Sequence, residues 1–457
     1  MSLINVAKKT VDRALKAGAS QAEASVFYAD SALTRFTKNM IHQNVASEIY
    51  FINLDVVVGG NKLGSSTITS IQDKAISRVV EAATKIAKVS SPDPDFKSFG
   101  KPKPFKPLPE AYCQKTADVT PEDRAEAIKI IVETTLDYNK LVKWSAGSFE
   151  TETLTFAVAN SLGVEAETRK TGASIEVNTK AGADDVEGSG LVTKYTHDVS
   201  EFDFEKIAKS TAKDAVNSVK PKTLPIGEYE AIFPPEVYST FSMFNASLGF
   251  SAKAYQDGYS FLKDMIGSKV FDEKLTIVDD ARSPDTYNLA PFDGEGTPKK
   301  RLSLVKKGVP ENVCYDNYTA TKDGTKSTGH SVPKFARGFF QRGMPVPINQ
   351  IVKPGSASVD EMISETKKGV YITRFNYVNP IRRDKAVISG LTRDACFYIE
   401  NGEVKHPIKV MRFTDAIPRV LGKIDLLGGR STVSKLGSVT APAMKVASFR
   451  FTGQSEY

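Results

Sequence analysis

The first half of the chain shows the same order of expected elements twice, and this repetition limits the fold more than any single motif. Apolar residues at helical spacing over 4–15 precede runs of alternating residues, and a second apolar helical stripe follows over 71–86. After Thr120-Pro121, a dipeptide typical of a helix start, alternating runs again lead to a helix over 204–216. The order predicts two α/β meander units within an α+β protein.

The strands of each unit are expected to be short, because turn residues and polar runs interrupt the alternation. In the first unit, which has a turn at Gly59-Gly60-Asn61, the expected strands span 23–29, 33–37, 49–58 and 62–69. In the second unit, which ends in a loop rich in Gly and Asp before its last helix, they span 151–159, 164–168 and 173–179. The two units are therefore expected to form two related layers.

Proline and glycine divide the chain into segments of different character. Six prolines between residues 91 and 116 predict an extended surface connector, and a plain linker is favoured over a segment that embraces a neighbouring subunit. Beyond residue 224, dense Gly and Pro and short β-type runs predict a β-rich domain, with helices only at 235–255 and near 358–367. We expect an N-terminal α+β domain, a Pro-rich linker, a middle α+β domain and a β-rich, sandwich or barrel-like C-terminal domain: 1–90, 91–116, 117–224 and 225–457.

The composition is typical of a soluble protein in a reducing compartment. The net charge of +7 over 457 residues is a mild basic bias, and no aromatic-rich strand accompanies the basic clusters, so nucleic-acid binding is not expected. Three widely spaced cysteines, Cys113, Cys314 and Cys396, do not suggest a disulfide framework. The N-terminal stretch has the pattern of a folded helix, and no apolar run is long enough to cross a bilayer; we expect no membrane contact and a cytoplasmic location.

The sequence carries none of the local signatures of metal-dependent or serine hydrolases. No histidine lies at metal-ligand spacing from another His or a Cys, although a metal site assembled from distant residues stays open: the four are His42, His197, His330 and His406. Gly-x-Ser-x-Gly is missing as well. A hydrolase site around Ser260, His330 and Asp279 also stays open, but Ser260 is better explained as a turn residue.

Short pieces spread over nearly the whole chain resemble the TldD/PmbA family, once called modulators of DNA gyrase and understood as metalloproteases. The stretch 233–280 is similar to the C-terminal domain of that family. The pieces follow the family's order: NSLGV at 160–164, GYS at 258–260, LTIVDD at 275–280, FDGEG at 292–296, YTA at 318–320, SGLTR at 389–393, YIENG at 398–402 and APAMKV at 441–446. Their collinear order, and no single piece, carries the resemblance.

The resemblance locates the position of a zinc motif. In the TldD branch, the helix before the GYS-type piece carries His-Glu-x-x-x-His, and a Cys near the C-terminus completes the zinc site. Counting back without gaps from Gly258 places Met243, Phe244 and Leu248 at the His, Glu and His positions, and the Cys position falls near 428–429. A thioether, a phenyl ring and an isobutyl group cannot hold zinc and activate its water, so the resemblance implies no catalytic residue, metal or cofactor on this chain.

The chain is thus most similar to the PmbA (TldE) branch of the family. This implies a zinc-free subunit that pairs with a zinc-bearing TldD-like partner in a heterodimeric metalloprotease acting on unfolded peptides or small proteins. Tyr259, Ser260 and Arg301 are the candidate contacts for an extended peptide, because they lie where the resemblance is densest. Two alternatives stay open: a homodimeric, non-catalytic peptide-binding or scaffold protein, and a self-sufficient hydrolase with an unrecognised site.

Overall fold

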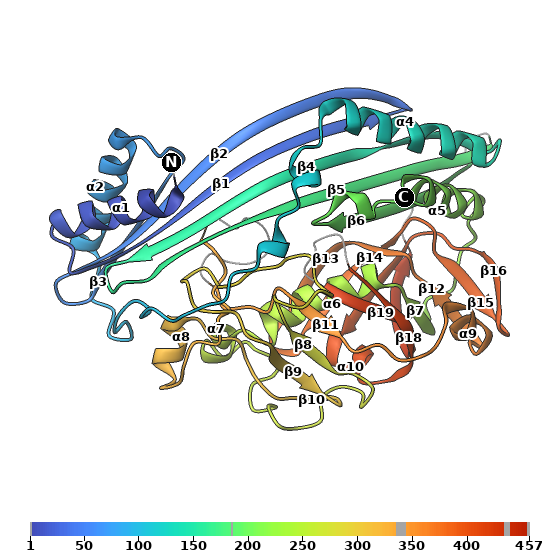
Figure 1. Cartoon of the computed structure of the whole chain (residues 1–457). Coiled ribbons are helices and arrows are strands. Elements are labelled where there is room, and N and C mark those ends of the chain that lie inside the picture. The colour runs from blue at the N-terminus through green and yellow to red at the C-terminus, as the bar shows by residue number, and fades with distance from the viewer. Residues whose placement is uncertain (1, 184–185, 335–343, 434–438, 455–457) are drawn as a thin grey trace.

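The computed structural model describes residues 2–183, 186–334, 344–433 and 439–454, which form two β-sheets with helices around them. The N-terminal sheet arches over the C-terminal half of the chain, which lies beneath it in Figure 1. The α+β class expected from the sequence is confirmed. None of the helices within the described ranges combines the length and the apolar character needed to cross a bilayer.

Six antiparallel strands form the N-terminal sheet in the order β3-β2-β1-β4-β5-β6. Their bounds are β1 (Gln21–Thr37), β2 (Met40–Val58), β3 (Lys62–Ile68), β4 (Val142–Asn160), β5 (Glu165–Ala183) and β6 (Val186–Thr196). The pairing of β1 with β4, from Glu23 opposite Asn160 to Phe36 opposite Gly147, joins the two predicted units. The prediction of two layers is therefore wrong, because both meanders belong to one sheet.

Several strands are longer than the sequence pattern predicted. The expected break at 30–32 lies inside β1, where Asp30 stands opposite Glu48 of β2. Residues 40–48 extend β2, and residues 186–196 form β6 where a loop was expected. Residues 40–48 of β2 are mostly exposed to solvent. Polar residues therefore continue the strand there without the alternation that a half-buried strand shows.

Helices cover one face of this sheet. α1 (Leu3–Lys16) and α2 (Asp73–Val89) pack on one end of that face, and α4 (Pro121–Tyr138) and α5 (Phe204–Asn217) pack on the other. Shorter helical turns lie between these elements: η1 (Pro109–Ala111), α3 (Gln114–Ala117) and η2 (Val199–Glu201). α4 begins at a capping box between Thr120 and Asp123, which confirms the helix start predicted from Thr120-Pro121.

The opposite face of the sheet turns toward the C-terminal half of the chain. Phe156 and Val158 of β4 pack there against Phe292. Nearby, the Lys170 ammonium donates a hydrogen bond of 2.7 Å to the Asn288 side-chain oxygen. Apolar packing and hydrogen bonds thus hold the N-terminal sheet, called the arch below, against the C-terminal half of the chain.

The Pro-rich segment 91–116 is extended over most of its length, as predicted, but it is packed against both halves of the chain. Phe96 and Phe99 are buried with Val57 of β2. The Lys106 carbonyl accepts a hydrogen bond of 2.8 Å from the Arg282 guanidinium. Whether 1–90, 117–224 and 225–457 fold as separate domains stays a prediction.

The C-terminal half contributes a mixed sheet of 13 strands within the described residues. The strands are β7 (Gly227–Phe233), β8 (Ile277–Asp279), β9 (Leu302–Lys306), β10 (Val309–Pro310), β11 (Gln350–Val352), β12 (Lys368–Tyr371), β13 (Arg374–Arg382), β14 (Val387–Arg393), β15 (Phe397–Glu400), β16 (Glu403–Pro407), β17 (Met411–Ala416), β18 (Ile424–Val433) and β19 (Val439–Gln454). The helices are α6 (Pro235–Leu248), α7 (Ala252–Gln256), α8 (Asn317–Lys322), α9 (Val359–Ser364), η3 (Arg383–Lys385) and α10 (Ile417–Leu421). The β-rich character is confirmed, and closure into a sandwich or barrel stays a prediction.

α6 packs against β19 through a cluster of aromatic rings. Phe241 of α6 and Phe449 of β19 both contact Phe233, with ring centroids 5.4 and 5.3 Å away. The predicted single helix over 235–255 is instead broken after Leu248. A Cβ at Gly249 would lie 2.6 Å from the Phe261 ring, so the chain uses a glycine where this close approach ends the helix.

Candidate functional site

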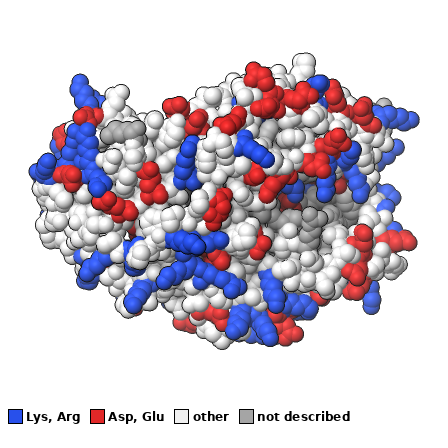
Figure 2. Space-filling model, in the orientation of Figure 1, with Lys and Arg blue, Asp and Glu red and all other residues white. Residues whose placement is uncertain are grey.

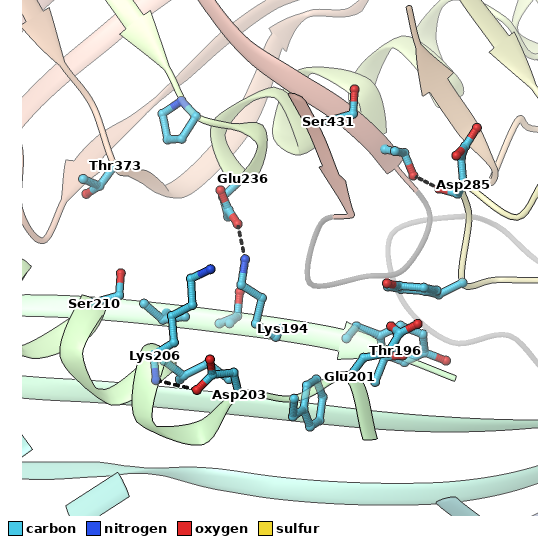
Figure 3. Close-up of a pocket in the computed structure, with 18 of the residues that line it drawn as sticks. Lys194, Thr196, Glu201, Asp203, Lys206, Ser210, Glu236, Asp285, Thr373 and Ser431 are labelled. Atoms are coloured by element: carbon cyan, nitrogen blue, oxygen red, sulfur yellow. Dashed lines mark hydrogen bonds and ion pairs between the residues drawn. The ribbon is translucent and has the colours of Figure 1, made fainter. Parts of the chain in front are cut away.

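A cavity of about 1030 Å³ lies between the arch and the C-terminal half of the chain (Figure 3). β6 and α5 form one wall, and the start of α6 together with parts of β11, β12, β18 and β19 forms the other. Each half of the chain supplies one wall, so the cavity exists only because the arch packs against the C-terminal half.

One edge of β6 pairs with no other strand in the described part of the chain and belongs to this wall. β6 is the last strand in the order of the N-terminal sheet and pairs with β5 along one side. Its residues Leu191–Thr196 line the cavity. A free strand edge presents backbone N–H and C=O groups to an added strand, so this wall can hold an extended peptide backbone.

Charged side chains meet across the cavity. The Lys194 ammonium of β6 and the Glu236 carboxylate of α6 point toward one another, 3.9 Å apart (Figure 3). On α5, Asp203 accepts a hydrogen bond of 2.9 Å from the Lys206 backbone N–H and so caps the helix. The cavity thus contains both signs of charge, which suits a peptide more than a strongly anionic ligand such as nucleic acid.

Two acidic residues of the cavity, Asp214 and Glu201, differ in their surroundings. Burial, reinforced by repulsion from Asp394, raises the pKa of the Asp214 carboxyl to about 6. Glu201 accepts a hydrogen bond of 2.8 Å from the Thr196 hydroxyl. Burial and a hydrogen bond to Glu201 also raise the pKa of the Tyr287 phenol, which therefore stays protonated near neutral pH.

The three positions that the resemblance assigns to the zinc motif face the hydrophobic core. Phe244 is fully buried and Leu248 is 5% exposed, both within the main hydrophobic cluster of the C-terminal half, and half-buried Met243 packs against that cluster. None of these side chains offers a lone pair suited to zinc, so the residues present do not fit the metal. Over the residues described, no group of three or more His, Cys, Asp or Glu side chains is placed to hold a metal ion.

The expected Cys position lies at the edge of the cavity. Gly429 lines it, and neighbouring Gly428 forms a parallel bridge with Ala357. The Gly429 N–H donates a hydrogen bond of 2.9 Å to the Ala357 carbonyl, and a Cβ at Gly429 would lie 3.2 Å from the Ser356 carbonyl oxygen. This close approach of two chain segments explains glycine at the position without reference to a metal.

His330 and Asp279 lie together, but not in the geometry of a serine hydrolase. His330 Nε2 lies 2.9 Å from the Asp279 carboxylate, and Nδ1 lies 2.9 Å from the carbonyl and hydroxyl oxygens of Thr328. The Ser260 hydroxyl instead donates to the Gly249 carbonyl and accepts from the Leu262 N–H. Both His330 nitrogens face other partners, and the prediction that Ser260 holds a turn is confirmed.

The predicted peptide contacts do not line the cavity in the described part of the chain. Tyr259 is half-buried, with the Arg383 guanidinium 5.9 Å from its ring centroid. Ser260 is 4% exposed, whereas Arg301 is exposed beside the start of β9. Their role in peptide binding stays a prediction.

Sequence reasoning missed the residues that do line the cavity. Lys194 lies on a strand read as part of a loop, and Glu236 was read only as part of a helix start. The alternation of Leu191, Thr193 and Tyr195 with other residues is the signal that could have identified β6. No local signal indicates that β6 and α6 face one another.

Comparisons with known proteins agree with this architecture. Residues 114–219 match the model of the PmbA/TldA metallopeptidase central domain, and residues 226–453 match that of the PmbA/TldA metallopeptidase C-terminal domain. The chain is 25% identical to Metalloprotease PmbA of Escherichia coli O157:H7 over 399 residues, covering 85% of this chain and 83% of the relative. It is 24% identical to the Metalloprotease PmbA homolog of Haemophilus influenzae, covering 96% and 94%.

The crystal structure of TldE from Thermococcus kodakarensis has the same fold. It superposes with a TM-score of 0.88 at 18% identity, covering 98% of this chain and all of the other. The two family models together span most of the chain. The chain therefore belongs to the PmbA/TldD metallopeptidase family.

Proposed function

We propose that this chain is the zinc-free, TldE-like subunit of a cytoplasmic TldD/TldE metalloprotease complex. A TldD-like partner supplies the zinc, and this chain completes the chamber that admits the substrate. It holds an unfolded peptide or small protein in the cavity beneath the arch. Met243, Phe244 and Leu248 carry the proposal, because core side chains occupy the motif positions and leave no group that binds zinc or activates water.

The geometry of the cavity supports a peptide as the ligand. The β6 edge supplies main-chain hydrogen-bonding groups, and charged and aromatic residues such as Lys194, Glu236 and Tyr371 supply side-chain contacts. The volume of about 1030 Å³ accommodates several residues of extended chain. On the face shown in Figure 2, acidic and basic side chains both lie over the arch and over the C-terminal half, and basic side chains also gather near the middle of the face.

The test uses the purified chain, a TldD-like partner and an unfolded protein substrate. Hydrolysis is expected from the mixture, with loss of activity on chelation, and no hydrolysis is expected from this chain alone. Chelator-sensitive proteolysis by this chain alone would overturn the proposal. Metal analysis of the isolated chain should find well under one zinc per molecule.

Two variants on α5 distinguish the effect of blocking the cavity from the effect of a change elsewhere on the surface. Ser210→Trp places a large ring in the cavity, whereas Lys209→Trp places the same ring on the exposed side of the same helix. Only Ser210→Trp should weaken binding of an unfolded peptide and slow hydrolysis by the mixture. Equal effects of the two variants would exclude this cavity as the peptide site.

The scaffold alternative predicts that this chain binds peptide and that adding a TldD-like partner produces no hydrolysis. The same mixture therefore distinguishes the two proposals. The self-sufficient hydrolase is disfavoured by one observation, the hydrogen bonds that hold Ser260 away from His330. Unchanged hydrolysis by the mixture after Ser260→Ala is expected.

A further inference from the structure

One acidic side chain of the cavity differs from the others. Asp214 of α5 lines the cavity, and no hydrogen bond or ion pair joins its carboxylate to another residue of the described chain. The other carboxylates of the described lining each have a partner: Glu201 accepts from the Thr196 hydroxyl, Asp203 from the Lys206 N–H and Asp285 from the Ser283 hydroxyl, and Glu236 pairs with Lys194. A half-buried carboxylate that has lost hydration without gaining a partner favours a ligand of opposite charge.

Asp214 is close to the strand edge that we assign to the peptide backbone. A Cβ at Gly190 of β6 would lie 3.0 Å from the Asp214 Cβ, so α5 packs closely on the strand at this point. Leu191, the next residue of β6, belongs to the lining of the cavity, as does Ser210 one turn earlier on α5. A side chain of a peptide bound along β6 can therefore reach the Asp214 carboxylate.

The charged groups around Asp214 do not neutralise it. Lys213, its neighbour on α5, is exposed to solvent. Asp394, in the turn between β14 and β15, is already paired with Arg374 at 2.7 Å. Burial is the main cause that raises the pKa of Asp214 to about 6; the Lys213 charge opposes the rise and the Asp394 charge adds to it. A cationic group placed in the cavity would stabilise the ionised form of this carboxylate.

An aromatic side chain faces the same part of the cavity from the opposite wall. Tyr371 of β12 lines the cavity, and burial together with the charges of Asp214 and Glu236 raises the pKa of its phenol. The ring therefore stays neutral near pH 7, and its face can attract a cation. A carboxylate on one wall and an aromatic ring on the other suit a primary ammonium group.

We propose that the Asp214 carboxylate binds a primary ammonium group of the peptide held in the cavity. The group is either a lysine side chain or a free N-terminus, and its recognition rests on the proposed function because it requires a peptide in the cavity. The Lys194–Glu236 pair carries no net charge, so the excess negative charge near Tyr371 comes from Asp214. Asp214 is thus a residue that determines which peptides the cavity prefers.

Three peptides of about eight residues, uncharged apart from the group under test, measure this preference. The first is capped at both ends and has one central lysine, the second has norleucine in place of the lysine, and the third has a free N-terminus and no lysine. In fluorescence anisotropy at pH 7, at least one cationic peptide should bind about three- to tenfold more tightly than the norleucine peptide. The peptide that shows the preference tells a lysine side chain from an N-terminus.

Asp214→Asn removes the charge and keeps the shape, so it should bring the ratio of affinities close to one. Glu205→Gln is the matched control, because Glu205 is exposed on the same helix and outside the lining of the cavity, and it should keep the wild-type ratio. Equal binding of all three peptides by the wild-type chain, or an unchanged ratio in Asp214→Asn, would overturn the role of Asp214 and leave the peptide site in place. Failure of every peptide to bind would instead remove the peptide site and this role together.

Proton release gives a second measurement that needs no variant. At pH 6 about half of the Asp214 carboxyls are protonated, and a bound ammonium group lowers their pKa, so the preferred cationic peptide should release up to about half a proton. Calorimetric titration in two buffers of different ionisation enthalpy measures this release. It should be absent with the norleucine peptide, and near pH 8, where Asp214 is already ionised. No release at pH 6, or equal release with the norleucine peptide, would contradict an ammonium group at Asp214.

Discussion

The Lys194 ammonium lies 3.9 Å from the Glu236 carboxylate, and this pair spans the cavity between the arch and the C-terminal half of the chain (Figure 3). Lys194 belongs to the edge strand β6, whereas Glu236 lies in the first turn of α6. Their side chains are 39% and 31% exposed, so water screens the pair and its direct contribution to stability is expected to be below about 1 kcal/mol.

Reversing one charge of this pair should change peptide preference more than stability. Glu236→Lys puts two cations in the cavity, so affinity should shift about three- to tenfold from a basic toward an acidic extended peptide of matched length. Fluorescence anisotropy with the two peptides measures the ratio. Glu403→Lys removes the carboxylate of an exposed pair with Lys405 outside the cavity and should leave that ratio unchanged.

Substitution at the motif positions should behave as substitution in a core. Phe244 is fully buried, so Phe244→Ala should lower the free energy of unfolding by about 3–5 kcal/mol. Met243→Ala should cost less because Met243 is half-buried, and Met265→Ala, at a 38% exposed position, should cost least. Urea unfolding monitored by circular dichroism gives the order, and a Phe244→Ala variant of wild-type stability would argue against core packing at this position.

A buried carboxyl at the end of the arch should make stability depend on pH. Burial raises the pKa of Glu23 to about 7, although the Lys334 ammonium, 3.7 Å away, opposes the rise. The folded state then binds a proton that the unfolded state has released, so the free energy of unfolding should fall as pH rises from about 5 to about 8. Asp293 acts in the same direction, because burial raises its pKa to about 6.

Glu23→Gln tests this pH dependence. The amide resembles the protonated acid and does not titrate. The fall in the free energy of unfolding between those pH values should therefore be smaller in the variant by on the order of 2–3 kcal/mol. Urea unfolding at several pH values measures the slope, with Glu126→Gln on the exposed side of α4 as the control. A slope unchanged by Glu23→Gln would show that Glu23 does not carry the excess proton.

The Asp279 carboxylate should be structural. It is fully buried, accepts from His330 Nε2 and the Asn349 N–H, and lies 3.9 Å from the buried Lys299 ammonium. Asp279→Asn removes the carboxylate that is paired with buried Lys299 and should cost about 3–5 kcal/mol of stability.

The stability change is measured by urea unfolding, with Asp285→Asn as the control because Asp285 is exposed in the same half of the chain. Although burial opposes it, Lys299 and His330 lower the pKa of Asp279, so its contribution should persist above the unfolded value and disappear only as pH falls through the lowered one. An Asp279→Asn variant as stable as wild type near neutral pH would contradict the structural role.

Local sequence patterns determined the four long helices α1, α2, α4 and α5, the β-rich character of the C-terminal half and the family. The capping residues Thr120 and Asp123 and the apolar stripe of α2 act within one or two helical turns, so they can be read directly from the chain. The motif positions 243, 244 and 248 could likewise be located by resemblance, and their lack of zinc ligands follows from side-chain chemistry alone.

Tertiary structure decided the rest. Because β1 pairs with β4, the two expected layers form one sheet. The packing of that sheet on the C-terminal half places Lys194 of β6 opposite Glu236 of α6. Strand pairing joins residues that are far apart in the chain, and no periodicity within a strand records which partner it will meet. The sequence therefore determined which residues cannot bind zinc, whereas only the folded chain decided which residues enclose the cavity.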